Sequence, residues 1–209
     1  MELKGTAINF LGDSITEGSG TSGLGKKFTD VLAREYEIIA FNYGIGGTRI
    51  AKQHNPSQEA KFDRDFCSRV AELEESADAV VVFGGTNDFG HGDAPMGSFT
   101  DCTSDTFYGA LHVLYSSLIT KFPGKPIVIV TPLHRTEEVT ATKALIDYVR
   151  AIREVAEYYS LPVLDLYAES GLQPNVPIIK QMNVPDGLHP NDAGHEIIAK
   201  KIANFMLTL

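Results

Sequence analysis

Cysteine and surplus positive charge are the two features that this sequence most clearly lacks. Only Cys67 and Cys102 occur in 209 residues, far apart and in no metal-ligand spacing. The sequence therefore indicates neither a disulfide framework nor a thiolate zinc site, and a reducing cytoplasm is the expected compartment. The formal net charge of −9 leaves no surplus of Lys or Arg to bind phosphates, so nucleic acid is not expected as a partner.

Long apolar runs are also missing. No run approaches the ~20 residues of a membrane span, and residues 1–4 lead directly into a predicted strand without the features of a secretory signal. We therefore expect no membrane insertion. The composition, with 43% hydrophobic and 22% charged residues, is typical of globular proteins, and the length predicts one domain over residues 1–209.

Short apolar runs alternate with stretches of helical period, which indicates an α/β fold with a parallel sheet. Five runs have the composition of strands, namely residues 7–11, 38–43, 79–84, 126–131 and 161–165. Apolar residues at helical spacing predict helices that pack on this sheet at 28–36, 111–122, 145–159 and 198–205.

Three stretches have no clear period and are rich in Gly, Pro, Asp and Ser: 44–65, 89–105 and 167–190. They begin where the second, third and fifth predicted strands end. In an open parallel sheet, ligand sites form at the carboxyl ends of the strands. The functional residues are therefore predicted to lie in these loops.

A serine follows the first predicted strand, in the segment GDSITEG at residues 12–18. At such a point, free backbone N–H groups and the positive end of a helix dipole can stabilise negative charge that develops when a serine attacks. A serine before a helical turn is also a common N-cap. Taken alone, the segment leaves both roles open for Ser14.

Glycine and asparagine follow the next two predicted strands. In NYGIGGT (residues 42–48), Gly47 can adopt positive φ and aim its N–H at an oxyanion, or it can belong to an ordinary turn. In GGTND (residues 84–88), the amide of Asn87 can donate to the same oxyanion, or it can stabilise its own turn.

An Asp and a His three residues apart precede the last predicted helix, in DGLHP at residues 186–190. Within one loop, Asp186 can accept from one ring nitrogen of His189 while the other nitrogen faces Ser14. Such a pairing fixes the tautomer of the imidazole. It also stabilises the imidazolium that forms when the serine is deprotonated.

The four segments, in this order, resemble the four sequence blocks of the SGNH (GDSL-like) hydrolases, a lipase and acylhydrolase family. The resemblance spans nearly the whole chain, and Ile15 is a conservative departure from the Leu of the GDSL name. It implies a single three-layer α/β/α sandwich whose five-stranded parallel sheet has the flavodoxin-like order 2-1-3-4-5. It also implies a serine esterase that requires no cofactor and no metal.

The resemblance also implies the roles of individual residues. Ser14 would be the nucleophile, His189 its base and Asp186 the group that orients the base. The N–H of Ser14, the N–H of Gly47 and the side chain of Asn87 would form the oxyanion hole. Water would then release the acyl group from the serine.

The substrate is predicted less closely than the chemistry. Five residues that follow predicted strand ends are candidates for lining the pocket: Tyr43, Ile45, Phe89, His91 and His134. Since no long apolar lid is evident, we expect short acyl groups, such as acetyl on a carbohydrate. The family also includes lysophospholipases, thioesterases and acyltransferases, which remain alternatives, and no oligomeric state is predicted.

A glycine-rich segment, GSGTSG at residues 18–23, matches the G-x-G-x-x-G pattern of dinucleotide-binding loops. Its first glycine lies several residues beyond the first strand. No Asp or Glu ends the second strand, where a ribose hydroxyl would be bound, so the match is poor. The G-x-S-x-G nucleophile elbow of α/β-hydrolases occurs at no serine, which argues against that fold.

Two further alternatives remain open. Asp186, His189, Asp192 and His195 have the residue types of a metal site, although Asp192 is well placed to cap the last helix and His195 lies within its first turns. A catalytically silent binding module could also keep the same fold. Simple binding, however, does not require a nucleophile, a base and oxyanion donors together.

Overall fold

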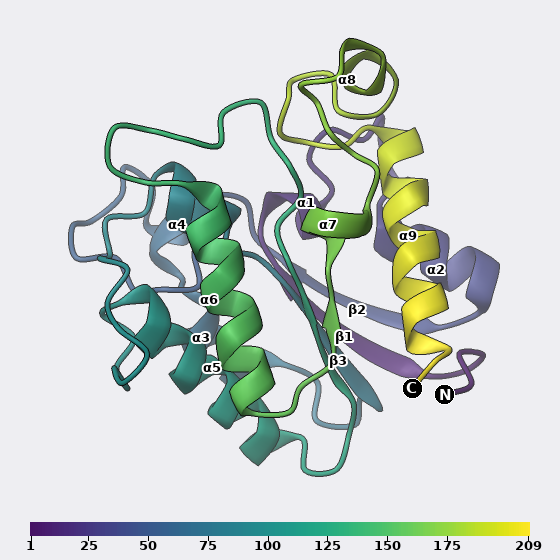
Figure 1. The fold of residues 1–209 in the computed structure, drawn as a ribbon. Coiled ribbons are helices and arrows are strands. Elements are labelled where there is room, and N and C mark those ends of the chain that lie inside the picture. Colours follow the sequence, from purple (N-terminus) through teal and green to yellow (C-terminus); the bar gives the residue numbers. More distant parts are fainter.

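A five-stranded parallel sheet forms the centre of the computed structural model, which describes all of residues 1–209 (Figure 1). The strands run in the order β2-β1-β3-β4-β5, which confirms the predicted fold class and topology. Their bounds are β1 (Ala7–Gly12), β2 (Ile39–Gly44), β3 (Ala79–Phe83), β4 (Ile127–Val130) and β5 (Val163–Leu164). The fifth strand is shorter than predicted, because only two of its residues pair with β4 at the edge of the sheet.

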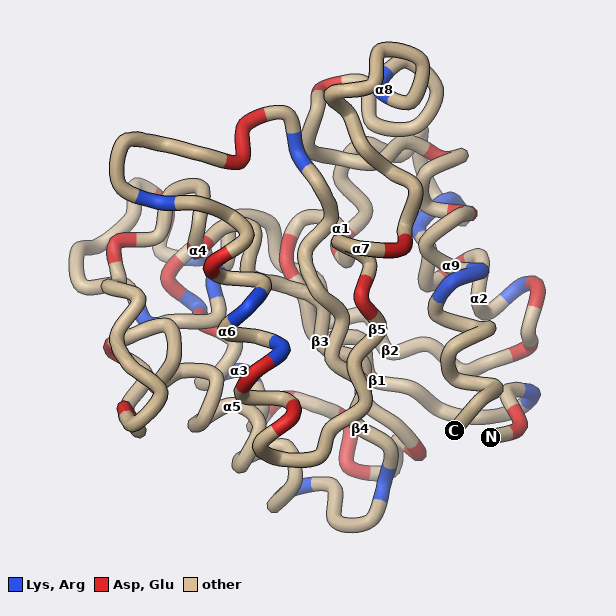
Figure 2. Tube along the Cα trace, in the orientation of Figure 1, with Lys and Arg blue, Asp and Glu red and all other residues tan.

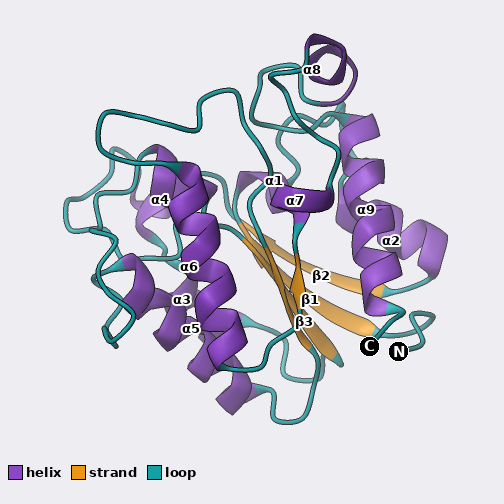
Figure 3. Ribbon diagram, viewed as in Figure 1, coloured by secondary structure: helices purple, strands orange, loops and turns teal.

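Helices cover both faces of this sheet (Figure 3). One face carries α3 (Phe66–Arg69), α5 (Phe107–Lys121) and α6 (Leu145–Tyr158), and the other carries α2 (Phe28–Tyr36) and α9 (Asp192–Met206). The loops contain shorter helical segments, which are α1 (Ser14–Glu17), η1 (Ala60–Asp63), η2 (Val70–Glu72), α4 (Thr86–Gly90), α7 (Leu166–Glu169) and α8 (Pro177–Asn183). The result is the predicted three-layer sandwich.

The hydrophobic core consists of two clusters, one on each face of the sheet. In β3, Val80 and Val82 pack toward α5 and α6, whereas Val81 and Phe83 pack toward α2 and α9, because successive side chains of a strand point to opposite faces. Burial on both faces explains why these strands are continuous apolar runs in the sequence. The predicted helical faces supply a large part of both clusters.

The surface and the termini add three further observations. The ammonium group of Met1 donates to the carbonyl oxygen of Met206 at 3.3 Å, and Figure 1 shows the two ends of the chain side by side. Lys and Arg positions are distributed along the chain among Asp and Glu positions (Figure 2). Both cysteines are free thiols.

None of the helices combines the length and the apolar character that crossing a membrane requires.

A buried arginine joins the carboxyl ends of β1 and β2. Arg69 is 1% exposed, and its Nη1 donates to the carbonyl oxygen of Tyr43 at 2.7 Å while Nη2 donates to that of Gly12 at 3.0 Å. Nη2 also donates to Oγ1 of Thr48 at 3.1 Å, and the guanidinium lies over the ring of Phe66. Burial lowers the pKa of Arg69 to about 10, so the group stays charged at neutral pH.

Replacing Arg69 by Met should therefore destabilise the fold. The substitution removes the Arg69 donors to the carbonyl oxygen of Tyr43 and to Oγ1 of Thr48, and one of the two donors to the carbonyl oxygen of Gly12. We expect the free energy of unfolding to fall by about 2–4 kcal/mol in urea titrations. Arg150→Met is the matched control, since Arg150 is exposed on α6 and pairs only with Asp147; its effect should stay within about 0.5 kcal/mol. Equal effects of the two substitutions would contradict the role given to Arg69.

Candidate active site

Ser14 is the first residue of α1, directly beyond the end of β1. The N-cap of this short helix is Asp13, whose Oδ1 accepts from the backbone N–H of Ile15 at 3.0 Å. The side chain of Ser14 is therefore not the helix cap. As in the first turn of any helix, the N–H of Ser14 has no partner within its own helix, and the residue is 8% exposed.

Ser14, His189 and Asp186 form a chain of two hydrogen bonds. The Oγ of Ser14 lies 3.0 Å from Nε2 of His189, and Nδ1 of His189 lies 2.7 Å from Oδ2 of Asp186. The sequence separation between Ser14 and His189 is 175 residues. The fold thus brings the serine after β1 against the loop before α9, as the sequence predicts.

The carboxylate of Asp186 is held by its own loop. Its Oδ1 accepts from the backbone N–H groups of Leu188 at 2.8 Å and His189 at 2.7 Å. Partial burial opposes ionisation of Asp186, but these N–H groups and the ring of His189 outweigh that effect, so its pKa lies below the usual value. Asp186 is consequently ionised at neutral pH and accepts from Nδ1 of His189, which leaves Nε2 free to accept the proton of Ser14.

Gly47 occupies a backbone conformation that only glycine adopts easily. Its φ is 77°, and a Cβ atom at this position would lie 2.6 Å from Cδ1 of Phe62. The N–H of Gly47 has no acceptor within the protein. Gly47 lines the same cavity as Ser14, so this N–H is available to a bound group.

The side chain of Asn87 is held at both ends of its amide, by a partner outside its own turn and by one at the end of that turn. Asn87 lies in the first turn of α4, is 4% exposed, and donates from Nδ2 to the carbonyl oxygen of Thr48 at 2.9 Å. Its Oδ1 lies 3.2 Å from Nε2 of His91. Because Nδ2 carries two hydrogens, one N–H remains without a protein acceptor at the cavity that Ser14 also lines.

One cavity of about 850 Å³ contains these groups. Apart from Pro56, its only apolar side chains are Phe62 and Leu188. Half of the lining residues belong to the loop after β2, and the others to the segments after β1, β3 and β4 and to the loop before α9. The lining residues include charged side chains and the polar side chains around Ser14, namely Ser14, Glu17, Arg49, Lys61, Asn87, His91, Asp93, Arg135 and His189.

Of the five predicted pocket residues, the structure places only His91 at this cavity. Phe89 is 2% exposed and packs edge-on against Tyr148 in the core, and Tyr43 packs against the same cluster. Nδ1 of His134 lies 2.6 Å from Oε1 of Glu138, and its ring packs against the ring of Tyr167.

Ile45 is likewise outside the lining, and its carbonyl oxygen accepts from the hydroxyl of Thr48. A position after a strand end therefore brings a residue near the site, but it does not decide where the side chain points. In an α-helical turn such as α4, neighbouring residues point to different sides, which sends Phe89 into the core and His91 to the cavity.

Two arginines at the cavity were not predicted from the sequence. Arg49 lies in the 44–65 loop that the sequence indicates as functional, directly after the glycine segment. Arg135 lies outside the three indicated loops; it donates to the carbonyl oxygen of Thr86 at 3.3 Å and lies over the ring of Phe89. Gly90 makes room for it, because a Cβ there would lie 2.8 Å from Nη1 of Arg135.

The glycine-rich 18–23 segment packs against the loop that carries His189. A Cβ on Gly20 would lie 2.4 Å from the carbonyl oxygen of Pro190 and 3.0 Å from Cβ of His189. Ser22 donates to Asp192 from its N–H at 2.8 Å and from its hydroxyl at 2.7 Å. Gly20 thus allows the two loops to approach closely.

The residues of the alternative metal site have separate partners. The sequence suggested that Asp192 caps α9, but Asp192 accepts from Ser22 instead. The cap is Asn191, whose side chain accepts from the N–H of Gly194 at 3.1 Å. His195 is fully buried, and its Nδ1 accepts from the N–H of Phe28 at 3.1 Å. No group of three or more His, Cys, Asp or Glu side chains is arranged to hold a metal ion.

Asp88 joins α4 to the loop after β2 from below the site. It is 3% exposed, and its two carboxylate oxygens accept from the N–H groups of Ile50 at 3.0 Å and Ala51 at 2.9 Å. Burial raises its pKa to about 6, and the two N–H groups offset only part of that effect. Asp88 therefore fixes the loop that supplies Gly47 relative to the helix that supplies Asn87.

Comparison with known proteins identifies the family of the chain. The model of the GDSL-like lipase/acylhydrolase family matches residues 10–197. The chain is 28% identical over 207 residues to the GDSL lipase Rv0518 of Mycobacterium tuberculosis, covering 94% of this chain and 79% of that protein.

Solved structures show the same fold. A protein from Lactobacillus plantarum is 31% identical with a TM-score of 0.85, covering 99% of this chain and 98% of that one. The lipase/acylhydrolase from Enterococcus faecalis is 21% identical with a TM-score of 0.66, covering 95% and 94% of the two chains.

Since the family model matches most of its length, the chain belongs to the GDSL-like lipase/acylhydrolase family. The resemblance inferred from the four sequence blocks is thereby confirmed. Membership of this family makes the protein a hydrolase of esters.

The raised pKa of Asp88 predicts how its replacement should depend on pH. The folded protein holds this proton more tightly than the unfolded chain does, so the stability it contributes is lost as pH rises from about 4 to 6. In urea titrations, the destabilisation caused by Asp88→Asn should therefore be larger at pH 4 than at pH 7, by up to about 3 kcal/mol.

Asp93→Asn is the control for this measurement. Asp93 is exposed; desolvation opposes its ionisation, but the hydrogen bonds from His54 and Asn55 together outweigh that effect and lower its pKa. The stability that its carboxylate contributes is retained as pH rises, so Asp93→Asn should be at least as destabilising at pH 7 as at pH 4. A destabilisation by Asp88→Asn that is equal at the two pH values would show that the Asp88 carboxyl is not titrating in this range.

Proposed function

We propose that the protein is a serine esterase in which Ser14 is the nucleophile, His189 the general base and Asp186 the residue that orients His189. The observation that carries the proposal is the pair of hydrogen bonds, 3.0 Å from Ser14 to His189 and 2.7 Å from His189 to Asp186. Both fall within the range expected between a nucleophile, its base and an orienting carboxylate. Family membership supports the reaction class.

In the first half of the reaction, Oγ of Ser14 attacks the ester carbonyl carbon as Nε2 of His189 takes the hydroxyl proton. The carbonyl oxygen becomes an oxyanion in the tetrahedral intermediate. His189 then returns the proton to the leaving alcohol as the bond between carbon and alkoxy oxygen breaks, which leaves the acyl group on Ser14. Asp186 stabilises the imidazolium that exists between these two proton transfers.

In the second half, His189 takes a proton from water, whose oxygen attacks the acyl-enzyme carbonyl. The intermediate collapses to the carboxylic acid, and Ser14 regains its proton. Three donors hold the oxyanion in both halves: the N–H of Ser14, the N–H of Gly47 and the second Nδ2–H of Asn87. Support for this role comes from their lack of protein acceptors and from the one cavity that all three residues line.

We further propose that the substrates are esters of short acyl groups, such as acetyl, on a polar alcohol such as a carbohydrate. The cavity of about 850 Å³ supports this, because only Pro56, Phe62 and Leu188 among its lining residues have apolar side chains. A long acyl chain would find few apolar side chains to pack against, and burial of each CH₂ group is favourable only in apolar surroundings. Hydroxyl-rich alcohols can instead bond to side chains such as Gln53 and Asn55.

Substitution of the reacting groups should abolish ester hydrolysis. We expect Ser14→Ala and His189→Ala to lose nearly all turnover of p-nitrophenyl acetate, and Asn87→Ala to lose about 10²- to 10³-fold in kcat, the usual effect of removing one oxyanion donor. Ser76→Ala, a change at an exposed serine that bonds to Glu74, should be unaffected. Normal turnover by the Ser14→Ala protein would refute the assignment.

Substrate range can be tested on the same protein. With p-nitrophenyl esters from acetate to palmitate, kcat/KM should be highest for acetate, and acetylated sugars should release acetate in a Ser14-dependent manner. A preference for palmitate or for lysophospholipid would favour the lipid alternative. Hydrolysis of acyl-thioesters in preference to all of these would favour a thioesterase, and acyl transfer to an added alcohol in preference to water would favour an acyltransferase.

A further inference from the structure

The amide of Asn87 is held in one orientation by partners at both of its ends. Nδ2 donates to the carbonyl oxygen of Thr48 at 2.9 Å, and Oδ1 lies 3.2 Å from Nε2 of His91. Rotating the amide by 180° would place Oδ1 against the carbonyl oxygen of Thr48, where two acceptors would face each other. The position of the second Nδ2–H therefore depends on both contacts.

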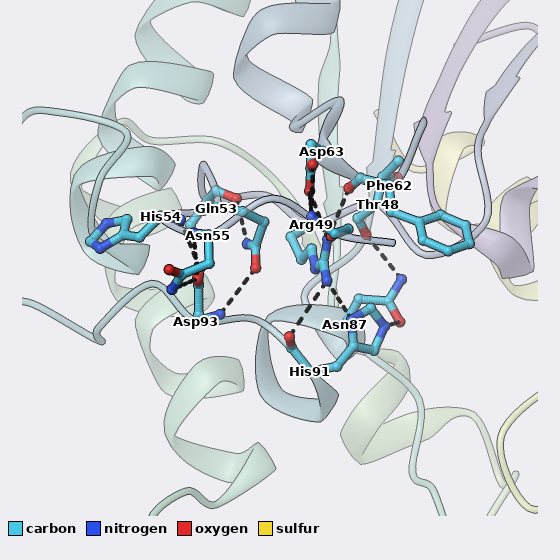
Figure 4. Close-up of polar contacts among 12 residues, drawn as sticks. Thr48, Arg49, Gln53, His54, Asn55, Phe62, Asp63, Asn87, His91 and Asp93 are labelled. Atoms are coloured by element: carbon cyan, nitrogen blue, oxygen red, sulfur yellow. Dashed lines mark hydrogen bonds and ion pairs between the residues drawn. The ribbon is translucent and has the colours of Figure 1, made fainter. Parts of the chain in front are cut away.

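His91 can donate to Asn87 only if Nε2 carries its hydrogen, and Arg49 determines that it does. Nη2 of Arg49 lies 2.8 Å from Nδ1 of His91. A guanidinium group has donors and no acceptor, so Nδ1 must present its lone pair. The hydrogen of the neutral ring is then on Nε2, which lies 3.2 Å from Oδ1 of Asn87. Figure 4 shows the side chains of Arg49, His91 and Asn87 and the contacts between them.

Arg49 is itself fixed by the loop after β2. It is 6% exposed, its Nη1 donates to the carbonyl oxygen of Phe62 at 3.0 Å and to the hydroxyl of Ser57 at 2.9 Å, and Asp63 lies 3.7 Å away. Figure 4 shows Arg49 between Asp63 on one side and His91 on the other. These contacts hold the guanidinium of Arg49 in place independently of His91.

The surroundings of His91 keep its ring neutral. Partial desolvation of the ring and the positive charges of Arg49, Arg135 and Lys143 lower its pKa to about 4. A protonated ring would have no lone pair for Arg49. Above that pH, one tautomer satisfies both neighbours.

We propose that His91 is a positioning residue for the oxyanion hole, which transmits the fixed position of Arg49 to the amide of Asn87. The Arg49–His91–Asn87 series holds the second Nδ2–H of Asn87 toward the oxyanion. Hydrogen bonds in series also polarise one another, which makes this N–H a stronger donor. The inference rests on the proposed oxyanion role of Asn87.

The test compares four proteins with p-nitrophenyl acetate: wild type, His91→Leu, Asn87→Ala and the double variant. An oxyanion exists only in the transition state and the intermediates, so losing its stabilisation lowers kcat and leaves KM nearly unchanged. We expect His91→Leu to lower kcat about 10- to 100-fold, as for a misplaced catalytic group. The double variant should lose no more than about threefold beyond Asn87→Ala, because His91 acts only through Asn87.

His91→Gln should restore kcat to within about fivefold of wild type, because one amide can accept from Arg49 and donate to Asn87. The matched control is His54→Leu, because His54 is an exposed residue of the loop after β2 whose ring bonds to the carbonyl oxygen of Asp105. The kcat of this variant should be unchanged. Should His91→Leu fail to fold, His91→Phe takes its place, since its planar ring has a similar shape and no nitrogen.

Two results would overturn the inference while leaving the proposed function intact. One is a normal kcat for His91→Leu beside an impaired Asn87→Ala, and the other is a double variant whose loss equals the product of the two single losses. A change in KM alone would mean that His91 contacts the substrate and does not position Asn87. A normal kcat for Asn87→Ala would instead refute the proposed oxyanion role of Asn87, and the positioning role of His91 with it.

Discussion

The site depends on the bonds of one buried guanidinium to the ends of two strands. Parallel strands bring their carboxyl ends to one edge of the sheet, but the loops that leave them must still be held in register with one another. Arg69 does this by donating to the carbonyl oxygens of Gly12 and Tyr43 and to the hydroxyl of Thr48. Ser14 and Gly47 lie within a few residues of these acceptors. Arg69 therefore fixes the distance between Ser14 and Gly47 without contacting either residue.

Two further ionisable side chains, Asp13 and Asp88, are buried beneath the site, and burial destabilises their charged forms. Burial raises the pKa values of both Asp13 and Asp88 to about 6, so each carboxylate is destabilised at neutral pH. Each carboxylate nevertheless accepts hydrogen bonds from the backbone and so fixes a loop. Asp13 caps the helix of Ser14 by accepting from one N–H group, and Asp88 accepts from two N–H groups in the residues after Thr48. A polar site on loops thus obtains its rigidity from ionised side chains in the core, where an apolar core alone would not specify loop positions.

Much of the architecture could be predicted from sequence, because strands buried on both faces are continuous apolar runs and the helices between them have one apolar face. Ser14, Gly47, Asn87, Asp186 and His189 could be singled out because each lies in a short motif at a strand or helix end. Arg49, Arg69 and Asp88 could not. Their contacts join side chains to backbone groups far away in sequence, 57 residues for Arg69 and Gly12, and such contacts leave no periodicity. Of the five predicted pocket residues only His91 lines the cavity, because loop position does not determine side-chain direction.

The central claim is that Ser14 is a nucleophile activated by His189, and covalent labelling tests it without assuming any substrate. Wild-type protein, Ser14→Ala and His189→Ala would each be treated with a fluorophosphonate and examined by intact mass and peptide mapping. The account predicts one adduct on Ser14 of the wild type, none on Ser14→Ala, and strongly slowed labelling of His189→Ala. Labelling at another serine, or equal labelling rates with and without His189, would contradict it.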